Sequence, residues 1–440
     1  MEASPKAAAG AGDTLALGFG TSVAMWFLGY LSRIPSVSAP SWLLGLGLLA
    51  CLLGGGFLAG RLTGRGWRAG LAAGVLSSTI NLLVLGTLLG GARANQILPS
   101  AAWWIPGSLL LGALLGSTGA AVGAAGRRGR GVENWTAGLA AVAVAATMLQ
   151  VLVGGVVTGN GAGLAVVDWP NSFGYNMFLY PLSRMTGGIY YEHAHRLFGT
   201  LVGLTTVVLA AHLVRVERRA WVKRLAMLAV GVVIVQGILG GLRVTGSFTL
   251  STSPEAMTPS ITLAIVHGVL GPAFLALMVA IAVFVSTAWT GPLAAAARRH
   301  ATTERTLGAL LVGVVLVQLV LGAIQRHMAK GLLLHIAFAV VVLAMAVLVG
   351  SRLWGLYEDR DSLQRIGKVL MIVAVAQVML GFTAFIAVQA RAPNAPRAAW
   401  EVLLTTAHQG GGSVLLGCAV VTALFCRRLL VPVGEAGVSS

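Results

Sequence analysis

The sequence predicts an all-α polytopic membrane protein with about twelve transmembrane helices. Its 440 residues are 57% hydrophobic and only 10% charged, and the mean hydropathy is +0.86. These values are typical of integral membrane proteins. Apolar stretches of the length that crosses a bilayer, about 20 residues, recur twelve times. The segments between them are too short to hold a separate soluble domain.

The apolar stretches define the expected elements in order. The first follows a short polar leader without a small-residue cleavage site, so we expect a retained helix and not a removed signal peptide. The stretches lie near residues 14–32, 41–60, 69–91, 103–125, 135–158, 191–213, 225–244, 260–286, 306–324, 331–350, 368–387 and 401–426.

The net charge of +17 is explained by membrane topology. If both termini are cytoplasmic, most of the 30 lysine and arginine residues fall in inner loops or at the termini, as the positive-inside rule requires. We therefore expect an integral protein of a bacterial-type cytoplasmic membrane, with the lipid bilayer as its surroundings and no nucleic acid as a partner. Cys51, Cys418 and Cys426 fall in or at the ends of predicted helices, which argues against a disulfide or a cysteine metal site.

The chain is predicted to have three parts. Residues 1–132 form a four-helix extension that contains no histidine and is rich in Gly, Ala and Leu. Its small residues recur at helix-packing spacings, and its role is unknown, with docking or assembly as a possibility. Residues 133–300 and 301–440 are two tandem four-helix halves.

A spacing repeats between these two halves. His195 recurs as His335 after 140 residues, and His267 recurs as His408 after 141 residues. Four predicted helices carry a glutamine, then three residues, then a glycine that is often followed by another small residue, and each next helix carries one of these histidines. The glutamines are Gln150, Gln236, Gln318 and Gln377, and their distances to the histidines are 45, 31, 17 and 31 residues. The mismatch of 45 and 17 places an insertion in the first outer loop.

Ionisable side chains inside membrane helices are rare and usually functional. Two pairs of histidines repeated in register indicate that each half holds a group between two imidazoles, and haem iron takes ligands from opposite faces of a flat ring. We therefore predict that His195, His267, His335 and His408 ligate iron. The alternative is a set of structural core histidines. We interpret His212 and His300 as surface residues.

Other polar residues lie near the same predicted depth. Glu192 and His195 are three residues apart and share one face of a helix, which would place an acid beside a ligand of the first half. A polar cluster at a helix start is the alternative. Arginines at the outer face could pair with haem propionates or simply anchor the interface; they are Arg196, Arg243, Arg326, Arg391 and Arg397. Asp168-Trp169-Pro170 could anchor the first outer loop to the membrane interface through the Trp ring, or it could help to shape a lid over the first site.

Over about residues 135–430 the chain resembles the haem A synthase family. The resemblance rests on Gly154-Gly155, TGNGAGL, Asp168-Trp169-Pro170, Glu192-x-x-His195-Arg196, His267, His335 and His408-Gln409. It implies oxidation of the C8 methyl group of haem O to a formyl group, which gives haem A for cytochrome oxidase. His195 and His267 would then bracket substrate haem O, and His335 and His408 would ligate a haem B cofactor.

The resemblance also implies that Glu192 is the catalytic acid, beside the reacting methyl group, and that Arg196 helps to bind the haem. Haem O synthase and cytochrome oxidase assembly proteins are the expected partners. Two features depart from the family: the outer loops contain no cysteine pair, and residues 1–132 lie outside the family core.

Two other functions are open from the sequence. A non-catalytic di-haem cytochrome, or a haem carrier, would pass electrons or haem to a partner, and a transporter would bind no haem. Glu192 and the enlarged first loop favour an enzyme over an electron carrier. The shared depth of the four histidines favours haem binding over transport.

Overall fold

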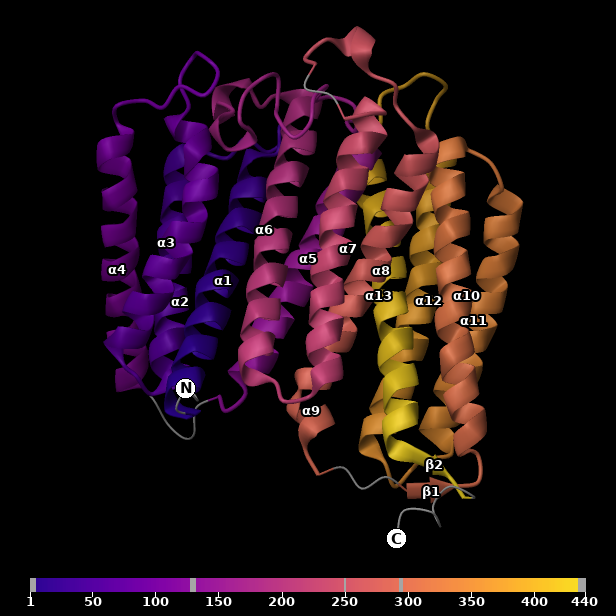
Figure 1. Ribbon diagram of the computed structural model, residues 1–440. Helices are drawn as coiled ribbons and strands as arrows, with labels where there is room; N and C mark the ends of the chain where they lie inside the picture. The colour runs from indigo at the N-terminus through magenta and orange to yellow at the C-terminus, as the bar shows by residue number, and fades with distance from the viewer. Residues whose placement is uncertain (1–4, 127–131, 249–250, 293–295, 434–440) are drawn as a thin grey trace. The chain divides into compact units, whose positions relative to one another are not determined.

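The computed structural model describes residues 5–126, 132–248, 251–292 and 296–433 and is almost entirely helical (Figure 1). Within these residues, twelve helices are long and apolar enough to cross a membrane, which confirms the predicted fold class and each predicted span to within a few residues at most ends. They are α1 (Pro5–Arg33), α2 (Ser41–Thr63), α3 (Trp67–Leu89), α4 (Ala101–Ala125), α5 (Trp135–Gly159), α6 (Gly187–Val216), α7 (Ala220–Thr245), α8 (Ile261–Val285), α10 (Ala301–Met328), α11 (Leu332–Gly355), α12 (Asp361–Gln389) and α13 (Ala399–Leu429).

The remaining elements are short. One-turn 3-10 helices occur at η1 (Met177–Leu179), η2 (Leu182–Arg184) and η3 (Pro254–Ala256), and α9 (Thr287–Thr290) is a single helical turn. Strands β1 (Ala296–Arg298) and β2 (Leu430–Pro432) form one parallel pair. Backbone polar groups in a bilayer must be satisfied internally, which explains why helices make up all the membrane-spanning elements found.

The chain divides into two compact units. The first comprises residues 1–153, 161–237 and 244–259, and the second comprises residues 154–160, 238–243 and 260–440. In the second unit, α10, α11, α12 and α13 contact one another in a ring, and α8 packs against α10 and α13. Leu311, Leu353, Leu370 and Leu416 belong to the core of this unit and are almost completely buried.

In the first unit, small residues let α2, α3 and α4 approach backbone to backbone. A Cβ atom added at Gly60 would lie 1.9 Å from the carbonyl oxygen of Ala120, and one added at Gly74 would lie 2.1 Å from that of Gly112. No side chain fits at such distances. The small-residue pattern of the extension is therefore explained by close helix packing.

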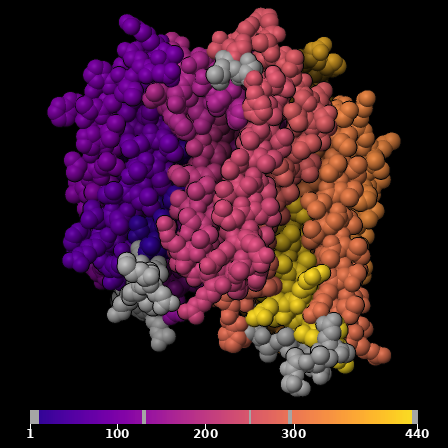
Figure 2. All heavy atoms as spheres, in the orientation of Figure 1, coloured from indigo at the N-terminus to yellow at the C-terminus, as the bar shows by residue number. Residues whose placement is uncertain are grey.

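Large apolar side chains lie on the outer surface, as expected for helices surrounded by lipid tails, and Figure 2 shows one face of this surface. Trp103 and Leu333 are more than 80% exposed, and Trp42, Leu110 and Ile372 are more than 60% exposed. Such a surface would be unfavourable in water, which agrees with the predicted membrane environment.

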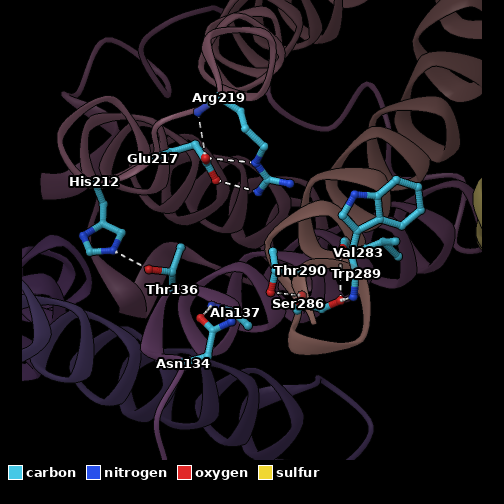
Figure 3. Close-up of polar contacts among 10 residues, drawn as sticks. All are labelled: Asn134, Thr136, Ala137, His212, Glu217, Arg219, Val283, Ser286, Trp289 and Thr290. Carbon is cyan, nitrogen blue, oxygen red and sulfur yellow. Dashed lines mark hydrogen bonds and ion pairs between the residues drawn. The ribbon is translucent and has the colours of Figure 1, made fainter. Parts of the chain in front are cut away.

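The prediction that His212 is a surface residue is wrong. His212 lies near the end of α6 and is only 5% exposed, and its Nε2 is 3.0 Å from the hydroxyl of Thr136 (Figure 3). Its Cε1 lies 3.4 Å from the place of a Cβ on Gly12. The ring faces neighbouring helices because the Thr136 hydroxyl satisfies one nitrogen there. His300, by contrast, is exposed as predicted.

Candidate functional site

The clearest pairing of predicted ligands lies in the second unit. His335, near the start of α11, and His408, in the third turn of α13, have ring centres 6.2 Å apart, with ring planes at 87°. A metal–imidazole bond is about 2.0 Å long, and a ring centre lies about 1.1 Å from its nitrogen, so two ligands on opposite sides of one metal have ring centres about 6 Å apart. The observed spacing fits one metal held between the two rings.

The rest of the donor set favours a metal that brings its own equatorial ligands. Among the described residues, no three His, Cys, Asp or Glu side chains gather closely enough to hold a metal ion. Two imidazoles alone suit haem iron, because the porphyrin supplies the other four nitrogen atoms. The pair His335 and His408 therefore fits haem better than a bare ion.

Glycines make room for three of the four histidine rings. A Cβ at Gly322 would lie 3.1 Å from Cε1 of His335, and a Cβ at Gly381 would lie 2.8 Å from Cε1 of His408. In the first half of the repeat, a Cβ at Gly240 would lie 3.0 Å from Cε1 of His267. Each glycine belongs to the helix that precedes its histidine, so a larger residue there would push against the ring.

The two histidines of the first half fall in different compact units. His195, on α6, belongs to the first unit, and Nε2 of Gln150 donates a hydrogen bond of 3.1 Å to its backbone carbonyl. His267, on α8, belongs to the second unit. Their predicted pairing around a substrate haem stays a prediction.

Glu192 is buried at 4% exposure and both its oxygens accept hydrogen bonds. Oε1 accepts from Arg196 at 2.9 Å, one turn along α6, and Oε2 accepts from the backbone N–H of Val166 at 3.0 Å. The carboxylate is therefore held between its own helix and the first outer loop. Charge-assisted hydrogen bonds of this kind are strong where water is scarce.

The guanidinium of Arg196 also faces this loop. It donates to the backbone carbonyls of Asp168 at 2.6 Å, Asn171 at 2.9 Å and Val166 at 3.0 Å. Together with Glu192, these acceptors fill the donor directions of both terminal nitrogens. The structure thus gives Arg196 the task of holding the loop, and its predicted contact with haem stays a prediction.

Two further side chains, which sequence reasoning had not assigned to a contact, fasten the same loop. Asp168 is fully buried, and its carboxylate accepts from the backbone N–H groups of Phe173 at 2.6 Å and Gly174 at 2.8 Å. His193 is also fully buried, and its Nδ1 lies 3.0 Å from the hydroxyl of Ser172. His193 follows Glu192 directly and points away from His195, as the helical angle between them predicts.

The N-terminal extension contacts this outer loop. Tyr175 donates to the carbonyl of Ala92 at 2.7 Å, and the N–H of Asn176 donates to the side chain of Asn95 at 2.7 Å. A Cβ at Gly90 would lie 2.1 Å from the carbonyl oxygen of Leu179. The loop that covers the start of α6 therefore packs on the end of α3 and the segment after it.

The extension also packs directly against α6. The hydroxyl of Tyr190 donates to the carbonyl of Tyr30 at 2.6 Å, and the two rings stack with centres 5.7 Å apart. Phe198 packs edge-on against Trp26 and Tyr30. Trp26, Tyr30, Tyr190 and Phe198 stand out in the sequence as aromatic residues, but their spacing does not show that they contact one another.

Arginines cluster near the predicted outer end of the second half. Arg391 and Arg397 line a cavity of about 550 Å³ together with Asn160. Arg391 forms an ion pair of 2.9 Å with Glu401, and Arg397 donates to the carbonyls of residues 158 and 159. Arg326 has a buried Nη2 without a hydrogen-bond partner among the described residues.

This cluster lies close to the ligand pair along α13. Glu401 is seven residues before His408, which is about 10 Å of helix, and the two share one face. The ion pair of Arg391 with Glu401 therefore lies about two turns before His408, and Arg391 also lines the cavity.

A comparison with protein families matches the part of the chain that contains several of these site residues. Residues 174–335 match the model of the family described as COX15-CtaA: Cytochrome oxidase assembly protein. The matched segment contains Glu192, His195, His267 and His335, and it ends before His408. No curated protein matches the chain. Over residues 174–335 the chain is therefore similar to the COX15-CtaA cytochrome oxidase assembly protein family, which agrees with the haem A synthase resemblance of its motifs.

Proposed function

We propose that this protein is a haem A synthase, which oxidises the C8 methyl group of haem O to a formyl group. The 6.2 Å spacing of the His335 and His408 rings is the observation that carries the haem-binding part of the proposal, because the two rings would hold one iron between them. The family match supports the role in cytochrome oxidase assembly. Conversion of a methyl group to an aldehyde adds the oxygen of one water and releases four protons and four electrons, and an electron acceptor from outside this chain must take up the electrons.

In the second half, His335 and His408 would hold haem B as the resident cofactor. Haem B supplies one-electron chemistry when bound. Gly322 and Gly381 leave space for the two imidazoles, and the neutral form of each ring provides the lone pair for iron. Arg391 and Arg397, which line the cavity, would attract the two propionates.

In the first half, His195 and His267 would bind substrate haem O, and Glu192 would act on protons at the reacting methyl group. A carboxylate that is 4% exposed exerts a strong field, because little water screens it. Its ion pair with Arg196 keeps it in place. The loop fastened by Arg196 and Asp168 would exclude water from this side.

A second candidate function has one observation in its favour. Both oxygens of Glu192 are already occupied, by Arg196 and by the N–H of Val166, which is also the pattern of a purely structural ion pair. A di-haem membrane cytochrome or haem carrier would need the histidines but no reactive carboxylate.

The proposed setting follows from the charge distribution. The twelve apolar helices make the protein integral to a membrane, and we assign it to a bacterial-type cytoplasmic membrane with both termini in the cytoplasm. Haem O would come from a haem O synthase, and the product would pass to cytochrome oxidase assembly partners.

Product analysis separates the two functions. Cells that make haem O and express the full chain are expected to contain haem A, identified by mass spectrometry of extracted haem. Unchanged haem O beside a haem spectrum of the purified protein would favour the cytochrome. A protein without any haem spectrum would refute both.

The role of Glu192 is tested with Glu192→Gln, which keeps the shape of the side chain and removes its charge. We expect bound haem to remain and haem A formation to stop. Glu217→Gln is the matched control, since Glu217 also pairs with an arginine, Arg219, but lies at the other end of α6. Full haem A formation by Glu192→Gln would refute a catalytic role.

A further inference from the structure

The proposed function gives a role to the four histidines but none to the glutamine of each Gln-x-x-x-Gly segment. In three of the four repeats the described residues show what it does. Gln318 reaches His335, Gln377 reaches His408, and Gln150 reaches His195. In every case the contact runs from one helix to the histidine of the next.

The contact has two parts. The side-chain amide nitrogen donates to the backbone carbonyl of the histidine itself, at 3.0 Å for His335 and 2.9 Å for His408. The same nitrogen lies 3.1 Å from Nδ1 of the ring in both cases. One glutamine thus touches both the backbone and the ring of one residue, which restricts how that ring can turn.

The glycine of the segment completes this arrangement. Residues four apart lie on one face of a helix, so Gln318 and Gly322, or Gln377 and Gly381, meet the same histidine. The glutamine contacts Nδ1, and the glycine leaves room for Cε1. The segment therefore provides a polar contact to the histidine ring and, one turn later, open space beside that ring.

We propose that Gln-x-x-x-Gly is a positioning unit for the haem-ligating histidines. In the second half it would set the plane of each imidazole through its contact at Nδ1, and its amide oxygen would accept from Nδ1 when Nε2 binds iron. The inference rests on the proposed function in one respect, namely that the ligand is haem.

A buried acceptor supports this assignment. Oε1 of Gln318 and of Gln377 is buried and has no hydrogen-bond partner among the described residues. A histidine that binds a metal through Nε2 carries its proton on Nδ1, and such a proton almost always has an acceptor. In the structure the amide nitrogen faces Nδ1, so the proposal requires the amide to turn until Oε1 accepts from Nδ1 when iron is bound.

The first half uses the unit differently. Gln150 keeps the bond to the backbone carbonyl of His195, but its nitrogen lies 3.4 Å from Nε2 of the ring. The second half, in which both rings present Nδ1 to a glutamine, is therefore the place for the test.

The experiment compares two substitutions of Gln377 in full-length protein purified with bound haem. Gln377→Leu removes the acceptor, and Gln377→Glu strengthens it. A stronger acceptor makes the imidazole more electron-rich and stabilises ferric iron. We expect the midpoint potential of the bound haem to rise in Gln377→Leu and to fall in Gln377→Glu. Haem affinity should decrease about 10-fold or more in Gln377→Leu.

Two controls distinguish this effect from a general disturbance of the helices. Gln364→Leu also deletes a glutamine of α12 that donates to a neighbouring carbonyl, that of Trp354 at 3.1 Å, and should leave the potential unchanged. Gly322→Ala should alter the low-spin haem spectrum by turning His335. Gly313→Ala, on the same helix with open space around its Cβ position, should not.

Opposite shifts in the two Gln377 variants support the proposal, because a merely structural hydrogen bond would give no reversal of sign. If Gln377→Leu does not fold, the shift in Gln377→Glu and the Gly322→Ala comparison decide. Haem bound with the same potential and spectrum in all variants overturns the positioning unit and leaves the proposed function standing. A wild-type protein without haem overturns both.

Discussion

Replacement of Arg196 by methionine should release the first outer loop. Arg196 is the only described side chain that joins Glu192 to the carbonyls of Val166, Asp168 and Asn171. Its side chain is 10% exposed and that of Glu192 is 5% exposed. Methionine fills similar space but offers no donor, so a buried carboxylate and three carbonyls lose a partner.

The expected cost follows from this burial. Removing one partner of a buried ion pair destabilises a protein by about 3–5 kcal/mol. If the cost falls on the loop alone, its open fraction rises at least about 100-fold. Because the backbone N–H groups of Val166 and Phe173 bond to Glu192 and Asp168 in the closed loop, they report this opening.

Hydrogen–deuterium exchange of the purified protein, read by mass spectrometry over residues 162–186, measures it. Arg196→Met should exchange at least about 100-fold faster in this segment. Arg219→Met is the control, because it deletes an arginine–glutamate pair at the opposite end of α6. Exchange within about tenfold of wild type in Arg196→Met would refute the view that Arg196 holds the loop.

Two further predictions concern the extension and the loop between α6 and α7. Gly90→Ala should also speed exchange of the outer loop, since its Cβ would lie 2.1 Å from the carbonyl oxygen of Leu179, whereas Gly107→Ala, with open space around it, should not; equal exchange in both would contradict the packing. Hydrogen bonds from Arg219 lower the pKa of Glu217 from 4.5 to about 2. This pair therefore stabilises the protein fully above pH 4.5, and the stabilisation is lost as the pH falls through about 2. Thermal unfolding at a series of pH values should show Arg219→Ala less stable than wild type at neutral pH. The difference in stability should disappear as the pH falls from 4.5 to about 2. A difference that does not change with pH would contradict a stabilising role of this pair.

The sequence was sufficient for the helices because a bilayer leaves few choices. A run of about 20 apolar residues must form a helix to satisfy its backbone, so all twelve spans followed from composition. The repeat that relates His195 to His335, and His267 to His408, was likewise found by counting residues along the sequence. The segment matched by the family contains three of these four histidines. The packing role of the small residues at Gly60 and Gly112 also followed from their spacing.

Contacts between distant segments required the tertiary structure. From the sequence, Arg196 could pair with a propionate or anchor the interface. Only the structure shows that it also donates to the carbonyls of a loop some 25 to 30 residues earlier, because tertiary packing brings that loop to α6. His212 reads as a surface residue until Thr136 is placed beside it. The glutamines had a visible period, yet only the packing of α10 on α11 and of α12 on α13 shows that each reaches the histidine of the next helix. Sequence periodicity gives the face on which a side chain lies, and the packed helices determine which atom it meets.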